Sequence, residues 1–107
     1  MDAQTLVDSL ANAPDVDVSA WLDGHQEGLA AAFETEWMGV GKQRIEALGL
    51  SGELDAGLSL AAKLEQVARW VGDPLALALV HRAQANILQF HERYGESMAY
   101  AERAAAL

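Results

Sequence analysis

Hydrophobic residues along the chain recur three or four positions apart, and the strict apolar–polar alternation of a half-buried strand is nearly absent. This spacing places apolar side chains along one face of a helix. The pattern therefore predicts an all-α fold with two short and four longer helices. We expect these helices at residues 3–11, from about 17 to 24, and at 26–48, 53–71, 74–91 and 95–107.

The clearest helix break is the sequence VGDP. Gly72 suits a left-handed position just after a helix, where a side chain would be strained. Asp73 suits an N-cap, and Pro74 suits the first turn of the next helix. We therefore expect one helix to end at Val71 and the next to begin at Pro74.

A second break is the sequence GLSGE at residues 49–53, in which Ser51 is a candidate N-cap. Gly39 and Gly41 fall inside the predicted helix before it. Glycine is unfavourable inside a helix. These two glycines therefore indicate either the close approach of a neighbouring helix or a kink.

Short connections favour antiparallel packing of successive helices. The chain accordingly divides into two helical hairpins behind a pair of small N-terminal helices. We expect the short helices, acting as a cap, at residues 1–25, a degenerate hairpin at 26–72 and a second hairpin at 73–107.

The last segment, HRAQANILQFHERYGESMAYAERAAAL, resembles a tetratricopeptide repeat. A small residue at Ala85, a larger apolar residue at Leu88, an aromatic residue at Tyr94 and small residues at Ser97 and Ala104 carry the resemblance. It covers residues 74–107 and implies a fragment of an α-solenoid.

Three positions depart from the tetratricopeptide pattern. Glu92 stands where the repeat usually has its turn glycine, Ser97 replaces the first alanine of the second helix, and His81 replaces a tryptophan-like residue. The pair of helices at 26–71 is a weaker copy.

The order of the segments, together with the run GDPLALAL…RAQAN…ERYGES…AYAERA, resembles the N-terminal repeat region of long bacterial proteins that end in a caspase-like (CHAT) peptidase domain. Such a peptidase uses His and Cys, and this sequence has no cysteine. The resemblance therefore implies a sensing or docking arm.

The final predicted helix carries an apolar edge that a repeat normally buries against the next repeat or a capping helix. Two interpretations of this edge stay open. Either Leu107 is a cut edge followed by further repeats in a longer protein, or the chain associates with itself there. The edge consists of Met98, Ala101, Ala104 and Ala105.

The charge narrows the range of partners. The chain has 16 acidic and 7 basic residues, a formal net charge of −9. This argues against nucleic acid and against anionic membrane surfaces, because both attract clustered Lys and Arg. It favours a partner with a basic patch, or it only keeps acidic helices soluble. The sequence also lacks cysteine, a secretory signal and an apolar run of ~20 residues. We therefore expect a soluble cytoplasmic protein.

Nothing in the sequence organises a catalytic or metal site. His81 and His91 are ten positions apart on one predicted helix, which separates their Cβ atoms by about 15 Å, too far for one zinc ion. The third histidine is His25. Glu34 and Glu36, two positions apart, do not share a helix face. We expect no metal, no cofactor and no enzymatic activity.

The candidate binding residues come from the repeat register. If Ala85 is the small packing residue, Arg82, Asn86 and Gln89 lie on the concave side, where tetratricopeptide domains hold peptides. Arg and Asn suit a carboxylate, since Arg donates bidentate hydrogen bonds to it. The alternative is that they only solvate a groove.

Among the three tryptophans, Trp21 and Trp37 fall on apolar stripes and are expected in the core. Trp70, at a helix end, is the one expected to touch a partner. The sequence thus predicts a protein–protein interaction module that binds a protein or peptide. The alternative is a self-contained helical protein that dimerises through its apolar edges.

Overall fold

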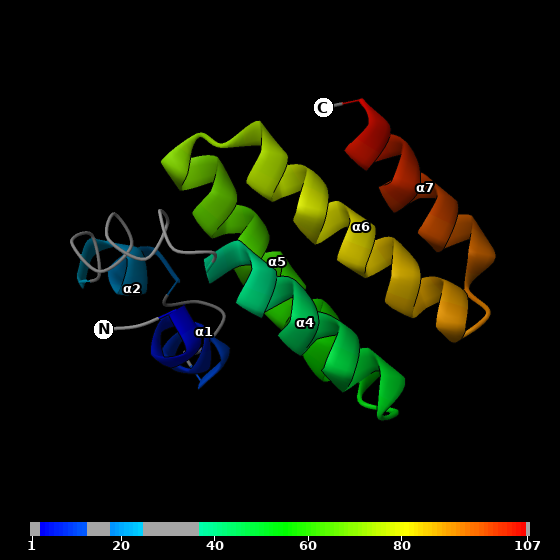
Figure 1. Cartoon of the computed structure of the whole chain (residues 1–107), viewed down its shortest axis with the longest axis horizontal. Helices are drawn as coiled ribbons and strands as arrows, with labels where there is room; N and C mark the ends of the chain where they lie inside the picture. The colour runs from blue at the N-terminus through cyan, green and yellow to red at the C-terminus, as the bar shows by residue number, and fades with distance from the viewer. Residues whose placement is uncertain (1–2, 13–17, 25–36, 107) are drawn as a thin grey trace.

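The structure, a computed structural model, describes residues 3–12, 18–24 and 37–106 (Figure 1). These residues form helices joined by turns and contain no strand, which confirms the predicted all-α fold. No helix in these ranges is long and apolar enough to cross a membrane. The helices are α1 (Ala3–Asn12), α2 (Val18–Gly24), α4 (Trp37–Leu50), α5 (Leu54–Val71), α6 (Pro74–Phe90) and α7 (Tyr94–Ala105).

The junction between α5 and α6 has the predicted chemistry. Gly72 adopts a left-handed conformation with φ 79°, and its N–H donates to the Ala68 carbonyl. The Asp73 carboxylate accepts hydrogen bonds from the backbone N–H groups of Leu75 (2.9 Å) and Ala76 (3.3 Å). Pro74 has no N–H, so these two bonds satisfy the free N–H groups that remain in the first turn of α6.

Ser51 does not cap α5, so that prediction is wrong. The N-cap position belongs to Glu53, and no side chain makes a capping bond there. The Ser51 hydroxyl instead donates to the Leu48 carbonyl at 3.0 Å. The physical reason is that the last carbonyls of α4 lack partners within their own helix, so the Leu48 carbonyl accepts from the Ser51 hydroxyl and also from the Glu53 N–H at 2.9 Å.

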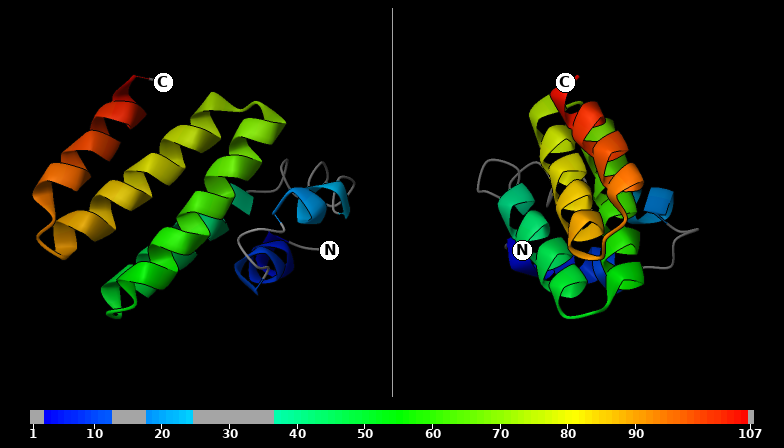
Figure 2. Two further views of the ribbon diagram at one scale, coloured as in Figure 1. Left: turned by 180° about the vertical axis from the view of Figure 1, so that it is seen from behind. Right: turned by 90° about the vertical axis from the view of Figure 1, so that its right-hand side faces the viewer.

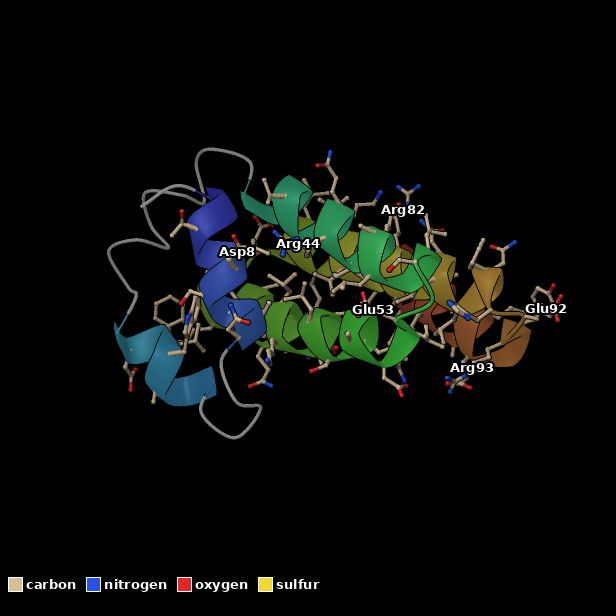
Figure 3. All side chains as sticks on the ribbon, turned by 90° about the horizontal axis from the view of Figure 1, so that it is seen from below. Asp8, Arg44, Glu53, Arg82, Glu92 and Arg93 are labelled. Atoms are coloured by element: carbon tan, nitrogen blue, oxygen red, sulfur yellow. The ribbon has the colours of Figure 1, made fainter. Side chains whose placement is uncertain are left out.

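From α4 onward, the helices pack on one another in the order in which they follow along the chain. α4 and α5 run side by side, α6 packs against both of them, and α7 packs chiefly against α6 (Figures 1 and 2). α1 packs against α4 and α5 on the side of the molecule away from α7. There Asp8 of α1 forms an ion pair with Arg44 of α4 (Figure 3). The largest of the fully buried side chains are those of Val7, Leu10, Ile45, Leu64, Val67, Gln84, Ile87 and Leu88.

Glycines let these helices approach closely. A Cβ added at Gly41 would lie 2.8 Å from Leu64 Cδ1, so α5 lies directly against this glycine, as predicted. A Cβ at Gly49 would lie 2.6 Å from Ile87 Cβ, and one at Gly57 would lie 3.2 Å from Ile87 Cδ1. Among the residues that the structure describes, no atom lies within 4 Å of the equivalent point at Gly39. The side chain of Ile87 thus packs where α4 and α5 both carry glycine.

The α4–α5 turn and the α6–α7 turn have the same backbone geometry, 40 positions apart. Each contains a single left-handed residue, Gly52 (φ 88°) in the first and Glu92 (φ 62°) in the second. Their backbone hydrogen bonds correspond one to one: Ser51 to Ala47 and His91 to Ile87, Gly52 to Gly49 and Glu92 to Gln89, Glu53 to Leu48 and Arg93 to Leu88, Gly57 to Glu53 and Ser97 to Arg93.

Candidate partner-binding groove

A groove of about 470 Å³ lies between α6 and α7. The residues that line it are mainly small and uncharged, with three longer polar side chains on the α6 side. They are Ala78, Arg82, Ala85, Asn86 and Gln89 of α6 and Ser97, Ala101, Ala104 and Ala105 of α7.

The floor of the groove is closed by a hydrogen bond between the two helices. Ser97 is buried on α7, and its hydroxyl donates to the carbonyl of Ala85 on α6 at 2.8 Å. Neither residue has a side chain large enough to separate the two backbones. The small residues that bring the helices together therefore also leave the space above them open.

A ring contact between His81 of α6 and Tyr100 of α7 joins the two helices elsewhere along their interface, and each ring has a further contact within its own helix. The His81 ring is buried, its Nδ1 lies 2.9 Å from Gln84 Oε1, and its centroid lies 5.8 Å from that of Tyr100. The Arg103 guanidinium lies 4.7 Å from the Tyr100 centroid, a cation–π contact. This packing gives α7 its rotation about α6, and so sets which α7 residues face the groove.

Two of the histidines have structural contacts. His81 packs between α6 and α7, whereas His91 Nε2 lies 2.7 Å from the Gly49 carbonyl and links the two turns. Within residues 3–12, 18–24 and 37–106, no group of three His, Asp or Glu side chains could hold a metal ion. His25, Glu34 and Glu36 lie outside the described residues.

Arg82 is the groove's one charged lining residue, and it has no ion pair or side-chain hydrogen bond within the described part of the chain. Figure 3 shows Arg82 apart from the labelled acids Glu53 and Glu92. All seven Lys and Arg residues fall within the described ranges. The other six contact a partner: Lys42 with Glu46, Arg44 with Asp8, Lys63 with the Ala11 carbonyl, Arg69 with Glu65, Arg93 with Glu96, and Arg103 with Tyr100.

The groove joins two sets of residues that the sequence suggested separately. It contains the three predicted binding residues of α6, Arg82, Asn86 and Gln89. Opposite them are three of the four predicted edge residues of α7, namely Ala101, Ala104 and Ala105. The remaining predicted residues lie outside its lining: Met98 is 62% exposed and Trp70 is 46% exposed.

Sequence reasoning missed two contributors. Ala78 extends the groove on α6, one helical heptad before Ala85, and the heptad spacing was a signal that could have found it. Ser97 was named as a small residue of the repeat pattern and as a replacement of its alanine, but not as part of a binding site, although it forms the floor of the groove. Trp21 and Trp37 were both expected in the core. Trp21 is buried, and its Nε1 donates to Ser9 Oγ at 2.9 Å. The Trp37 side chain lies outside the described residues.

Comparison with known proteins assigns no family to the chain: no protein-family model, curated protein or solved structure matches it. The function of the groove therefore has to be argued from its own geometry.

Proposed function

We propose that this protein is a protein–protein interaction module and that its α6–α7 groove holds a segment of a partner. The observation that carries the proposal is the groove itself, in which an unpaired Arg82 and two amide side chains face a row of alanines. Binding sites of this kind combine an apolar floor with a few polar groups that fix orientation. Asn86 and Gln89 can each donate and accept, so they suit a peptide backbone or a polar side chain.

The two matching turns support a helical-repeat scaffold. A tetratricopeptide repeat has a period of 34 residues, whereas the turns here are 40 positions apart. The proposed scaffold is tetratricopeptide-like in its paired helices and has a longer spacing between its two turns. Its role as the docking arm of a longer repeat protein with a caspase-like peptidase belongs to this proposal and rests on the sequence resemblance alone.

Site-specific photo-cross-linking tests the proposed function. A photoreactive amino acid replaces Ala101, an exposed lining residue of the groove, in the full chain within its source cells. The matched control places the same group at Ala62, which is exposed on α5 and does not line the groove. We expect a cross-linked protein from position 101, absent from position 62 and weakened by Arg82→Ala.

The outcomes of that experiment differ for each interpretation. A cross-link to a second copy of the chain would favour the dimer alternative. Equal products from both positions, or none from position 101, would contradict the proposed function. The same group at Trp70 asks whether the contact surface extends to the end of α5, as the sequence predicts.

A further inference from the structure

One groove of this protein already holds a helix. α6 packs into the groove between α4 and α5, and its Ile87 side chain lies against Gly49 and Gly57. Farther along α5, the side chains of Ala61 and Leu64 are fully buried. The contact is completed by a polar bond at the end of α6, from His91 Nε2 to the Gly49 carbonyl.

The α6–α7 groove is the counterpart of this occupied groove. The matching turns relate the two helix pairs by a shift of 40 positions. Gly49 and Gly57, against which the Ile87 side chain of α6 packs, therefore correspond to residues that line the open groove in the second pair, and so do the buried residues Ile45, Ala61 and Leu64. The correspondence is Ile45 with Ala85, Gly49 with Gln89, Gly57 with Ser97, Ala61 with Ala101, and Leu64 with Ala104.

The charged positions correspond in the same way, with one difference. In α4, Lys42 forms an ion pair with Glu46 at 2.7 Å. The corresponding residues of α6 are Arg82 and Asn86, so the cation is kept and its intrahelical acid is replaced by an amide. No lining residue of the groove is acidic, so the groove itself supplies no carboxylate to Arg82, and an acid on the occupant would complement its charge.

We infer that the α6–α7 groove binds an α-helix of a partner protein, one that brings a carboxylate to Arg82 and a large aliphatic side chain to the alanine floor. This inference rests on the proposed function and specifies its partner. It follows from the helix that fills the equivalent groove and from the missing acid beside Arg82.

The shape of the floor indicates where the aliphatic side chain sits. Near the turn, Gln89 and Ser97 replace the two glycines that receive Ile87 in the first pair, so a helix cannot approach as closely there. Farther from the turn, Ala85 and Ala104 replace the larger Ile45 and Leu64. The occupant's largest side chain therefore packs farther from the turn than Ile87 does.

A second copy of the chain is a poorer fit for this site. Two copies related by a two-fold axis would present the same patch to each other. Two concave floors of alanine leave empty space between them, and such space lacks packing contacts. Each copy would also bring its own unpaired Arg82 and no lining acid to the contact. A partner helix with a protruding side chain and a carboxylate satisfies both needs.

Selection from a displayed library of helical peptides, randomised along one face, tests the inference. The target is the full chain. We expect the enriched peptides to share an Asp or Glu and a Leu, Ile or Met on one face. Arg82→Glu should weaken their binding by about tenfold, and exchanging the shared acid for Lys should restore it. The matched control is Arg69→Glu, which changes the net charge equally on α5, outside the groove, and should leave binding unchanged.

Three further variants sharpen the test. Asn86→Glu places an acid four positions after Arg82, as Glu46 lies after Lys42. It should therefore weaken the binding of the acidic peptides. Ala101→Trp fills the groove from an exposed position, so it should abolish binding while the circular dichroism and melting temperature stay unchanged. A proline in the middle of an enriched peptide should also abolish binding, because proline breaks a helix.

Several results would overturn the inference: no enriched peptide, binding that survives Ala101→Trp, binding that tolerates the proline, or acid preference unaffected by Arg82→Glu. If sedimentation shows a dimer that Ala101→Trp converts to a monomer, the occupant is a second copy. These failures are separate from a failure of the proposed function. A cross-link from position 101 to another protein, together with peptides that bind in extended form, would support the docking function. It would contradict only the inference that the bound segment is helical.

Discussion

Glu92 and Gly52 occupy equivalent turns, and both have a left-handed backbone. A side chain in this conformation costs roughly 1–2 kcal/mol relative to glycine. Glycine also gives the unfolded chain more freedom, which offsets part of that gain. We therefore expect Glu92→Gly to raise the free energy of unfolding by about 0.5–1 kcal/mol, measured by chemical denaturation.

Glu92→Ala is the control for charge, because the chain has a net charge of −9 and any lost acid could relieve repulsion. Alanine keeps the left-handed strain, so it should not reproduce the gain. Equal stabilisation by alanine and glycine would show that charge, and not backbone conformation, limits the turn. Gly52→Ala should act in the opposite direction and lower the stability by about 1 kcal/mol.

At the scale of the helices, two glycines of α4 should respond in opposite ways to the same substitution. Alanine is favoured over glycine inside a helix by up to about 1 kcal/mol, so Gly39→Ala, whose methyl group meets no atom of the described residues, should stabilise the protein. Gly49→Ala adds a methyl group 2.6 Å from Ile87 Cβ and should destabilise it by about 1–3 kcal/mol. Thermal unfolding of the two variants is the measurement. A gain at both positions would mean that α6 does not pack closely on Gly49.

The helix boundaries were predictable because their signals are local. Gly72, Asp73 and Pro74 each determine the backbone within one turn of their own position, and the structure has all three in their expected roles. Gly49 was less predictable. Its sequence neighbours suggested a break, yet it belongs to the last turn of α4 because Ile87, far away in the chain, packs on it.

The groove was predictable only in part, because it also depends on contacts between residues that are far apart in the chain. Helical periodicity places Arg82, Asn86 and Gln89 on one face, so their common position could be inferred from α6 alone. That this face meets Ala101 and Ala104 depends on the rotation of α7 about α6. The Ser97–Ala85 bond and the ring of His81 set that rotation, and no pattern within one helix encodes it.

For the whole molecule, the order of packing implies an order of stability. α6 lies against α4, α5 and α7 and contains eight buried residues. α7 packs chiefly on α6, and Ser97 is the single buried residue of its described span. An element with few buried contacts opens locally at a lower free energy than the rest of the fold. α7 is thus the helix that a partner in the groove would stabilise most.

Amide hydrogen exchange should reveal this gradient. We expect the α7 amides to exchange at least about tenfold faster than the central amides of α5 and α6, corresponding to ~1.4 kcal/mol. Ser97→Ala removes the hydrogen bond to the Ala85 carbonyl, worth about 1 kcal/mol, and should speed exchange in α7 about fivefold. It should leave α5 unchanged, because α5 can retain its packing against α4 and α6 while α7 opens. If α5 and α7 exchange together in both proteins, the helices unfold as one unit, and occupancy of the groove would then stabilise the whole fold rather than α7 alone.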